Sequence, residues 1–235
     1  MKYWARDLKV DTNEILIAKD ILKIYPQNLV AVDHISMSVK KGEFLFIMGK
    51  SGAGKSTLIK IISKQEEPDS GKIYIGKREI TTVPRNQGYR IRRELGVVFQ
   101  DFKLIQYKNV FENIAFALEV LGYKDKYIRI RTMEVLELVG LTNKAKKFPL
   151  TLSGGEQQRI AVARAIVNQP LILFADEPTG NLDWETSFEL MNLFLKINEE
   201  GTTIIMSTHN EDIIKKLKKR TLVIEKGKKI DEILY

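Results

Sequence analysis

A glycine-rich loop between an apolar segment and a helical one constrains this chain more than any other feature. The loop has the sequence Gly-Lys-Ser-Gly-Ala-Gly-Lys-Ser over residues 49–56. It follows residues 44–48, a continuous apolar run typical of a buried strand, and it leads into a helix predicted over residues 55–64. A strand, a glycine loop and a helix in this order form a phosphate-binding loop, which predicts an α/β fold with a mainly parallel sheet.

The residue types in this phosphate loop predict that it binds the phosphates of a nucleotide. Gly49, Gly52 and Gly54 permit backbone conformations that other residues avoid, and they let the main chain approach phosphate. Successive backbone N–H groups and the positive end of the helix dipole attract the anion. Lys55 would supply a charge for the β- and γ-phosphates, and the Ser56 hydroxyl would ligate Mg²⁺. The expected ATP contacts here are Gly49, Lys50, Ser51, Gly52, Ala53, Gly54, Lys55, Ser56 and Thr57.

Polar residues also follow two other apolar strands, where ligands bind in parallel sheets. Asp176 and Glu177 directly follow the strand predicted over residues 171–175. Asp176 would orient Mg²⁺, and Glu177 is placed to act as the general base that polarises the attacking water. His209 follows the strand predicted over residues 203–207. A histidine there can sense the γ-phosphate or, alternatively, cap the next helix.

Two further residues are candidates whose roles the residues alone leave open. Gln100 ends an apolar strand before a helical segment, and its amide can contact Mg²⁺ or the lytic water. Tyr25 precedes a turn at Pro26 and can stack on adenine, but a strand tyrosine can equally pack in the core. His34 lies in the β-rich start of the chain and is interpreted as structural.

The segment Leu-Ser-Gly-Gly-Glu-Gln-Gln-Arg over residues 152–159 is the second informative motif. Ser153 followed by Glu156 predicts a helix capping box. A glycine-rich helix N-terminus is also an anion site. The two interpretations are compatible, and the question is which anion binds.

The order of predicted elements indicates one α/β domain with an insertion. Residues 14–39 are β-rich, and strands alternate with helices from residue 171 onwards. Between them lies a helical subdomain expected over about residues 101–168. We therefore expect an N-terminal extension over residues 1–13 that is flexible, and a single domain over residues 14–235.

Composition limits the classes of protein. No apolar run approaches the roughly 18 residues that a membrane helix needs, and the N-terminus lacks a signal-peptide core, so we expect a cytoplasmic protein. The chain has no cysteine and a net charge of +8, with short basic clusters. These clusters could bind an anionic partner, but they contain few interleaved aromatic residues. We therefore interpret them as solvent-exposed surfaces and do not expect nucleic acid as a partner.

Taken together, the motifs resemble those of the ATP-binding-cassette (ABC) ATPases, in that family's order and over nearly the whole chain. The resemblance implies an α/β nucleotide-binding domain with a P-loop RecA-like core, an N-terminal antiparallel β lobe and the helical insert. It also implies an ATP-dependent head-to-tail homodimer in which the 152–159 segment of one chain contacts the γ-phosphate of ATP held by the other. The residues that this resemblance assigns to nucleotide or interface contacts are Tyr25, Gln100, Ser153, Gly154, Gly155, Glu156 and Asp183.

Within that family, residues 92–102, 113–122 and 145–153 are similar to the FtsE-type cell-division ATPases. That branch implies a Mg²⁺-dependent ATP hydrolase at the cytoplasmic face of the cell membrane, bound to an FtsX-like membrane protein that controls cell-wall hydrolases. Residues 180–183 have a form shared with lipoprotein-releasing and macrolide-export ATPases, which are the alternative. A chromosome clamp is disfavoured because sustained heptads are absent from the sequence, and a non-hydrolysing module is disfavoured because Glu177 is present.

The segment over residues 109–122 has apolar residues around most of a predicted helix, including Phe116 and Val120. A surface helix normally shows one apolar stripe opposite a polar face. We hypothesise that one side packs within the insert and the other receives a short helix of the membrane partner. The alternative is a helix buried wholly within this chain.

Overall fold

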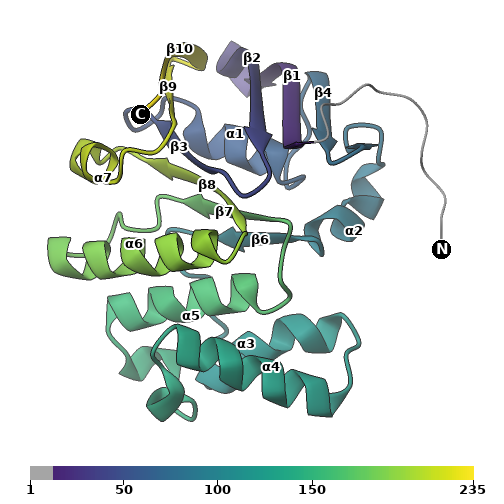
Figure 1. Ribbon diagram of the computed structural model, residues 1–235. Helices are drawn as coiled ribbons and strands as arrows, with labels where there is room; N and C mark the ends of the chain where they lie inside the picture. Colours follow the sequence, from purple (N-terminus) through teal and green to yellow (C-terminus); the bar gives the residue numbers. More distant parts are fainter. Residues whose placement is uncertain (1–12) are drawn as a thin grey trace. The chain divides into compact units, whose positions relative to one another are not determined.

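The computed structural model describes residues 13–235 (Figure 1), so the extension expected to be flexible lies, except for Asn13, outside the described residues. The chain divides into two compact units. Unit 1 comprises the described residues up to Arg92 together with Thr203–Tyr235, and unit 2 comprises Arg93–Thr202. The helical subdomain expected over about residues 101–168 falls within the limits of unit 2.

Unit 1 begins with the predicted antiparallel β lobe. Two 12-residue strands, β1 (Glu14–Tyr25) and β2 (Leu29–Lys40), form an antiparallel hairpin through a 3-10 turn at Pro26–Asn28. β4 (Ser70–Ile75) pairs with the other edge of β1, and β5 (Arg78–Glu79) follows it. Buried and exposed positions alternate along much of β1 and β2, as expected where one face of an antiparallel sheet covers a core.

Unit 1 also contains the buried parallel strands that carry the phosphate loop. β3 (Phe44–Met48) lies between β8 (Thr203–Thr208) and β9 (Thr221–Glu225) and runs parallel to both. β10 (Lys228–Ile233) is antiparallel to β9. β8 is buried along its whole length and β3 in all but its last residue, which explains why their sequences are apolar without alternation.

Three helices accompany these strands in unit 1. α1 (Lys55–Ile62) follows the phosphate loop, buries Leu58, Ile59, Ile61 and Ile62, and contacts β2 and β8 (Figure 1). The short α2 (Gly88–Arg92) ends the first part of the unit, and α7 (Glu211–Leu217) lies between β8 and β9. The phosphate loop is therefore supported from the β lobe as well as from the parallel strands.

Unit 2 consists mainly of helices. α5 (Gly154–Ile166) contacts α3 (Val110–Val120), α4 (Asp125–Leu138) and α6 (Trp184–Glu199). β6 (Leu95–Val98) and β7 (Ile172–Asp176) form a parallel pair, and α5 also contacts β6. In Figure 1 the three helices α3, α4 and α5 lie together as a helical layer. Short 3-10 turns at Thr142–Lys144 and Pro149–Thr151 precede α5.

Most predicted elements are confirmed, with shifts at their ends. The predicted span of β3 agrees with the structure, and β8 extends one residue beyond its predicted end, to Thr208. α1 ends two residues before its predicted limit, at Ile62. β10 was missed because its lysines were interpreted as a basic cluster. Lys226 and Gly227, with φ of 47° and 80°, form the two-residue turn with positive φ that favours a hairpin.

Over residues 13–235, every helix is either too short or too polar to cross a bilayer.

Candidate functional site

The phosphate loop of unit 1 has the features of an anion site. Lys55 is buried, and its Nζ donates to the carbonyl oxygens of Gly49 at 2.7 Å and Lys50 at 3.1 Å. The N-cap residue of α1, Gly54, has φ of 103° and makes no side-chain capping hydrogen bond. Side chains do cap α3, α5, α6 and α7 (Asn109, Ser153, Asp183 and Asn210). A bound phosphate would fit the N-terminus of α1, because its N-cap residue has no side chain to bond the first N–H groups of the helix.

Close backbone packing explains two of the glycines. A Cβ at Gly54 would lie 2.1 Å from the carbonyl oxygen of Ala31 in β2, and one at Gly49 would lie 2.4 Å from that of Ile224 in β9. The N–H of Gly227 also donates to the carbonyl of Ala53 at 3.0 Å. The loop therefore has its shape imposed by strands on both sides, and only glycine fits at these two points.

The remaining loop residues differ in exposure. Ala53 is buried, and Ser56 and Thr57 are half-buried at the start of α1. The residues at the tip of the loop face solvent: Lys50, Ser51 and Gly52.

His209 and Tyr25 are the other candidates in unit 1. His209 is exposed between β8 and α7. The N-cap of α7 is Asn210, whose Oδ1 accepts from the N–H groups of Asp212 and Ile213, so the alternative in which His209 caps this helix is wrong. Tyr25 is half-buried at the end of β1. His34, interpreted as structural, lies with its Nδ1 2.8 Å from Asp20 Oδ1.

In unit 2, Gln100 and the turn after β7 lie together. Asp176 is the last residue of β7, and Glu177 follows with φ of 48°. The carbonyl of Glu177 accepts from Gly180 N at 3.1 Å, and Asn181 Nδ2 donates to the carbonyl of Gln100 at 3.4 Å. β6 ends at Val98, so Gln100 lies two residues beyond the strand and not at its predicted end.

The N-terminus of α5 has the predicted capping box. Glu156 N donates to Ser153 Oγ at 3.3 Å, and Ser153 N donates to Glu156 Oε2 at 3.0 Å. The hydrogen bond from Lys144 Nζ, 2.6 Å from Glu156 Oε1, lowers the pKa of this carboxyl, as does the backbone N–H of Ser153. Ser153 and Gly154 are exposed, whereas Gly155 is buried. The capping interpretation is confirmed, and the anion-binding interpretation stays a prediction.

Asp183 is the N-cap residue of α6 and forms two hydrogen bonds with Thr186. Its Oδ1 accepts from Thr186 N at 2.9 Å and its Oδ2 from the Thr186 hydroxyl at 2.7 Å. The backbone N–H and then the hydroxyl of Thr186 lower the pKa of Asp183. A Cβ at Gly155 would lie 2.4 Å from the Thr186 methyl carbon, so the starts of α5 and α6 are in close contact.

Comparison with known proteins identifies the family. A family model described as ABC transporter matches residues 32–180. The chain belongs to the ABC transporter family. It is 50% identical over 209 residues to the cell division ATP-binding protein FtsE of Bacillus subtilis, which covers 89% of this chain and 92% of that protein. It is also 41% identical over 221 residues to the methionine import ATP-binding protein MetN of Carboxydothermus hydrogenoformans, covering 93% of this chain and 66% of that protein.

A solved structure supports the same conclusion about fold and activity. The ATP-binding cassette MJ0796, as a dimer in a post-hydrolysis state bound to ADP and Pi, is 34% identical with a TM-score of 0.85. The match covers 93% of this chain and 98% of that one. The predicted ABC cassette fold is therefore confirmed, and this ABC family member is an ATP hydrolase.

Two residues of this ABC ATPase were not assigned a role from sequence. Gln158 is fully buried, and its Nε2 donates to the carbonyl of Pro178 at 2.9 Å. Arg164 donates to the carbonyls of Phe102 at 2.8 Å and Lys103 at 2.6 Å, shortly after Gln100. Gln158 occupies an apolar-periodic position on α5, and a polar residue at such a position is the signal that could have indicated it.

We predict that Gly155→Ala destabilises this ABC ATPase. The new Cβ meets the Thr186 methyl, and rotating Thr186 away would break its hydroxyl bond to Asp183. We expect a loss of about 1–3 kcal/mol of unfolding free energy, measured by thermal or denaturant unfolding.

Gly154→Ala is the matched control, because its nearest neighbour would be Leu182 Cδ2 at 3.5 Å. Adding Thr186→Ser to Gly155→Ala removes the clashing methyl, keeps the hydroxyl and should restore stability. Wild-type stability in the single Gly155→Ala variant would contradict the close contact.

Proposed function

We propose that this ABC ATPase is the ATP-hydrolysing subunit of an FtsEX-type membrane complex in bacterial cell division. The observation that carries the proposal is 50% identity with B. subtilis FtsE over nearly the full length of both chains. In this complex the chain binds the cytoplasmic side of an FtsX-like membrane protein. ATP-driven dimerisation then moves that partner, which controls cell-wall hydrolysis on the other side of the membrane.

Within the catalytic cycle, the chain's own residues have separate tasks. The phosphate loop with Lys55 holds the β- and γ-phosphates, and Tyr25 stacks on the adenine. The carboxylate of Glu177 orients the attacking water and accepts its proton. His209 donates a hydrogen bond to the γ-phosphate. The positive φ of Glu177 supports a functional role, because such strain collects at active sites.

Mg²⁺ would be held by Ser56, Gln100 and Asp176 together with the phosphates. No cluster of three or more His, Cys, Asp or Glu side chains that could bind a metal is found in residues 13–235. This donor set fits Mg²⁺, which is usually held by one or two carboxylates, waters and substrate phosphates. The ion supplies charge neutralisation on the transferring phosphoryl group when it is bound.

The working form in this proposal is an ATP-dependent head-to-tail homodimer. The exposed Ser153 and Gly154 at the start of α5 offer a hydroxyl and backbone N–H groups to the γ-phosphate held by the other chain. Gly155 and Glu156 support that helix end, and Asp183 is exposed beside it. The dimeric cassette MJ0796 bound to ADP and Pi supports this arrangement.

The docking surface for the membrane partner is the outer side of α3. Val110, Ile114, Ala115 and Leu118 face inward and are buried, whereas Phe116 is 38% exposed and Val120 is 53% exposed. The helix therefore carries apolar side chains on a face that the described residues leave uncovered, as hypothesised from its sequence. Lys108 Nζ lies 5.5 Å from the centre of the Phe116 ring.

A second candidate is the ATP-hydrolysing subunit of a transporter. The 41% identity with a methionine import ATP-binding protein favours it, and the lipoprotein-releasing or macrolide-export type belongs to the same class. Isolation of the chain from membranes with its partner, followed by mass spectrometry, separates the two. An FtsX-like partner supports cell division, and a transport permease as the stoichiometric partner refutes it.

We predict that Lys55→Ala weakens ATP binding by about 10- to 100-fold, the value of a charge-assisted hydrogen bond. Isothermal titration calorimetry with ATP and Mg²⁺ measures it. Lys60→Ala, on the exposed side of the same helix, is the control and should bind as the wild type does. Equal affinity in Lys55→Ala and wild type would remove Lys55 from the phosphate site.

We predict that Glu177→Gln keeps ATP binding but slows turnover by about 10²- to 10⁴-fold, because the amide cannot accept the proton of the attacking water. The same variant should accumulate as a dimer in ATP, seen by size-exclusion chromatography with light scattering. Glu199→Gln, at the exposed end of α6, serves as the control. Unchanged hydrolysis in Glu177→Gln would exclude this residue as the base.

We predict that Phe116→Asp weakens capture of the FtsX-like partner by about 30-fold, the effect of losing an apolar interface residue. Basal ATP hydrolysis and thermal stability should stay near wild type. Ile230→Asp, at an apolar residue of β10 that is 55% exposed, is the control for adding a surface charge. Full partner binding by a folded Phe116→Asp variant would refute docking on α3.

A further inference from the structure

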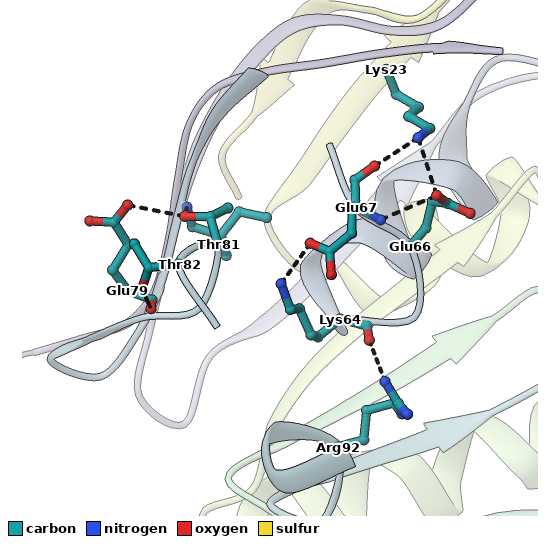
Figure 2. Close-up of polar contacts among 9 residues, drawn as sticks. Lys23, Lys64, Glu66, Glu67, Glu79, Thr81, Thr82 and Arg92 are labelled. Carbon is teal, nitrogen blue, oxygen red and sulfur yellow. Dashed lines mark hydrogen bonds and ion pairs between the residues drawn. The ribbon is translucent and has the colours of Figure 1, made fainter. Parts of the chain in front are cut away.

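Lys23 in β1 is a buried lysine whose ammonium group has hydrogen-bond and ion-pair partners within unit 1. It is 9% exposed, and its Nζ donates to the Glu67 carbonyl at 2.8 Å and to Glu66 Oε1 at 3.1 Å. Asp69 Oδ1 lies 3.5 Å from the same nitrogen. Figure 2 shows the Lys23 ammonium directed at Glu66 and Glu67. A buried lysine with this many acceptors is held in one position.

The acceptors belong to the segment that follows α1, the helix that begins at the phosphate loop. The N–H groups of Gln65 and Glu66 donate to the carbonyl of Lys60 at 2.8 and 3.0 Å, which ties the segment to the end of α1. Lys64 Nζ donates to Glu67 Oε2 at 2.6 Å, and Arg92 Nη1 donates to the carbonyl of Lys64 at 2.8 Å (Figure 2). Lys23 therefore connects β1 to a segment that is itself rigidly held.

Asp69 fixes the backbone on both sides of Lys23. Its N–H donates to the carbonyl of Leu22 at 2.8 Å, and its Oδ2 accepts from the N–H of Ile24 at 2.6 Å. The end of β1 is thus held to the segment after α1 by main-chain bonds as well as by the Lys23 ammonium. The next residue along the strand is Tyr25.

The Lys23 ammonium also lies 5.5 Å from the centre of the Tyr25 ring. Residues two apart on a strand point to the same face, which is why the two side chains meet. A cation at this distance is attracted to the π-face of an aromatic ring. The Tyr25 ring is therefore steadied by a charge whose own position is set by Glu66, Glu67 and Asp69.

We propose that Lys23 is a positioning residue for adenine recognition, which sets the place of the Tyr25 ring relative to the phosphate loop. The proposal rests on the assignment of Tyr25 to adenine made above. α1 links the two ends of the nucleotide site: it starts at the phosphate loop, and the segment after it holds Lys23. Lys23 thereby contributes to the affinity for the base and not to the affinity for the phosphates.

The charge that this role needs is present at neutral pH. Burial by itself would lower the pKa of Lys23, but the hydrogen bond and charge of Glu66, with the charge of Asp69, raise it above its ordinary value. Burial would raise the pKa of Glu66, yet the hydrogen bond from Lys23 lowers it overall. Both partners are thus ionised in the range where ATP binds.

The test compares a ligand that contains adenine with one that does not. The full-length Lys23→Met variant is titrated by calorimetry with ADP and, separately, with inorganic pyrophosphate, both with Mg²⁺. We expect ADP affinity to fall about five- to tenfold, within the range of a partly desolvated cation–π contact, and pyrophosphate affinity to stay within about twofold. An equal fall for both ligands, or none for ADP, overturns the proposal.

Two variants distinguish Lys23 from the adenine assignment itself. Tyr25→Leu should lose ADP affinity and keep pyrophosphate affinity, and adding Lys23→Met to it should cause no further loss. Unchanged ADP affinity in Tyr25→Leu would refute the adenine assignment. Loss in Tyr25→Leu without loss in Lys23→Met would refute only the role of Lys23.

Two further variants test whether the effect is specific to Lys23 and provide an alternative if Lys23→Met does not fold. Lys19→Met, at an exposed lysine of β1 whose Nζ lies 5.9 Å from the Tyr74 ring, should leave both affinities unchanged. If Lys23→Met does not fold, Glu66→Gln keeps a hydrogen-bond acceptor but removes the charge that holds Lys23. That variant should show a smaller fall for ADP alone, and a fall shared by both ligands would again overturn the proposal.

Discussion

The backbone contact at Gly54 is the constraint on which the rest of unit 1 depends. Its Cα lies so close to the carbonyl of Ala31 that a Cβ would come within 2.1 Å of that oxygen. Gly227 extends the contact, because its N–H donates to the Ala53 carbonyl and its own carbonyl accepts from Asp33 N. The β lobe, the phosphate loop and the turn before β10 therefore share a backbone junction, which holds the loop together with the Lys55 ammonium that donates to the carbonyls of Gly49 and Lys50.

In unit 2 the residues proposed to bind nucleotide also stabilise the local fold. Asp183 caps α6 and holds Thr186, which lies against Gly155. Ser153 caps α5 through the box that it forms with Glu156. Because one side chain serves both purposes, stability and nucleotide affinity have to be measured separately for each variant. Comparing ligands, as with ADP and pyrophosphate, separates the two effects within a single protein.

Local sequence patterns predicted most elements of this fold. The elements and contacts that were missed depend on residues far apart in the sequence or on a strand without a clear apolar pattern. The apolar strand of β3 and the capping box at Ser153 depend on near neighbours, and both are confirmed. β10 was missed because an edge strand rich in lysine lacks apolar alternation, and only the turn at Lys226 and Gly227 marks it. The apolar-periodic position of Gln158 on α5 could have indicated a buried polar residue, but its partner, the carbonyl of Pro178 twenty residues away, cannot be found from the sequence of that helix.

The sequence by itself determined the family and the phosphate loop, and it identified the candidate site residues. It could do so because glycine spacing, strand ends and helix caps are local patterns, each contained in a short segment of the chain. Only the tertiary structure decided which side chains are fixed in position and which distant residues bond to them. Lys23 shows the difference. In sequence it is one lysine among many, and only folding brings it to Glu66, Glu67 and the Tyr25 ring. The physical reason is that burial makes a charge costly unless distant parts of the chain supply its partners.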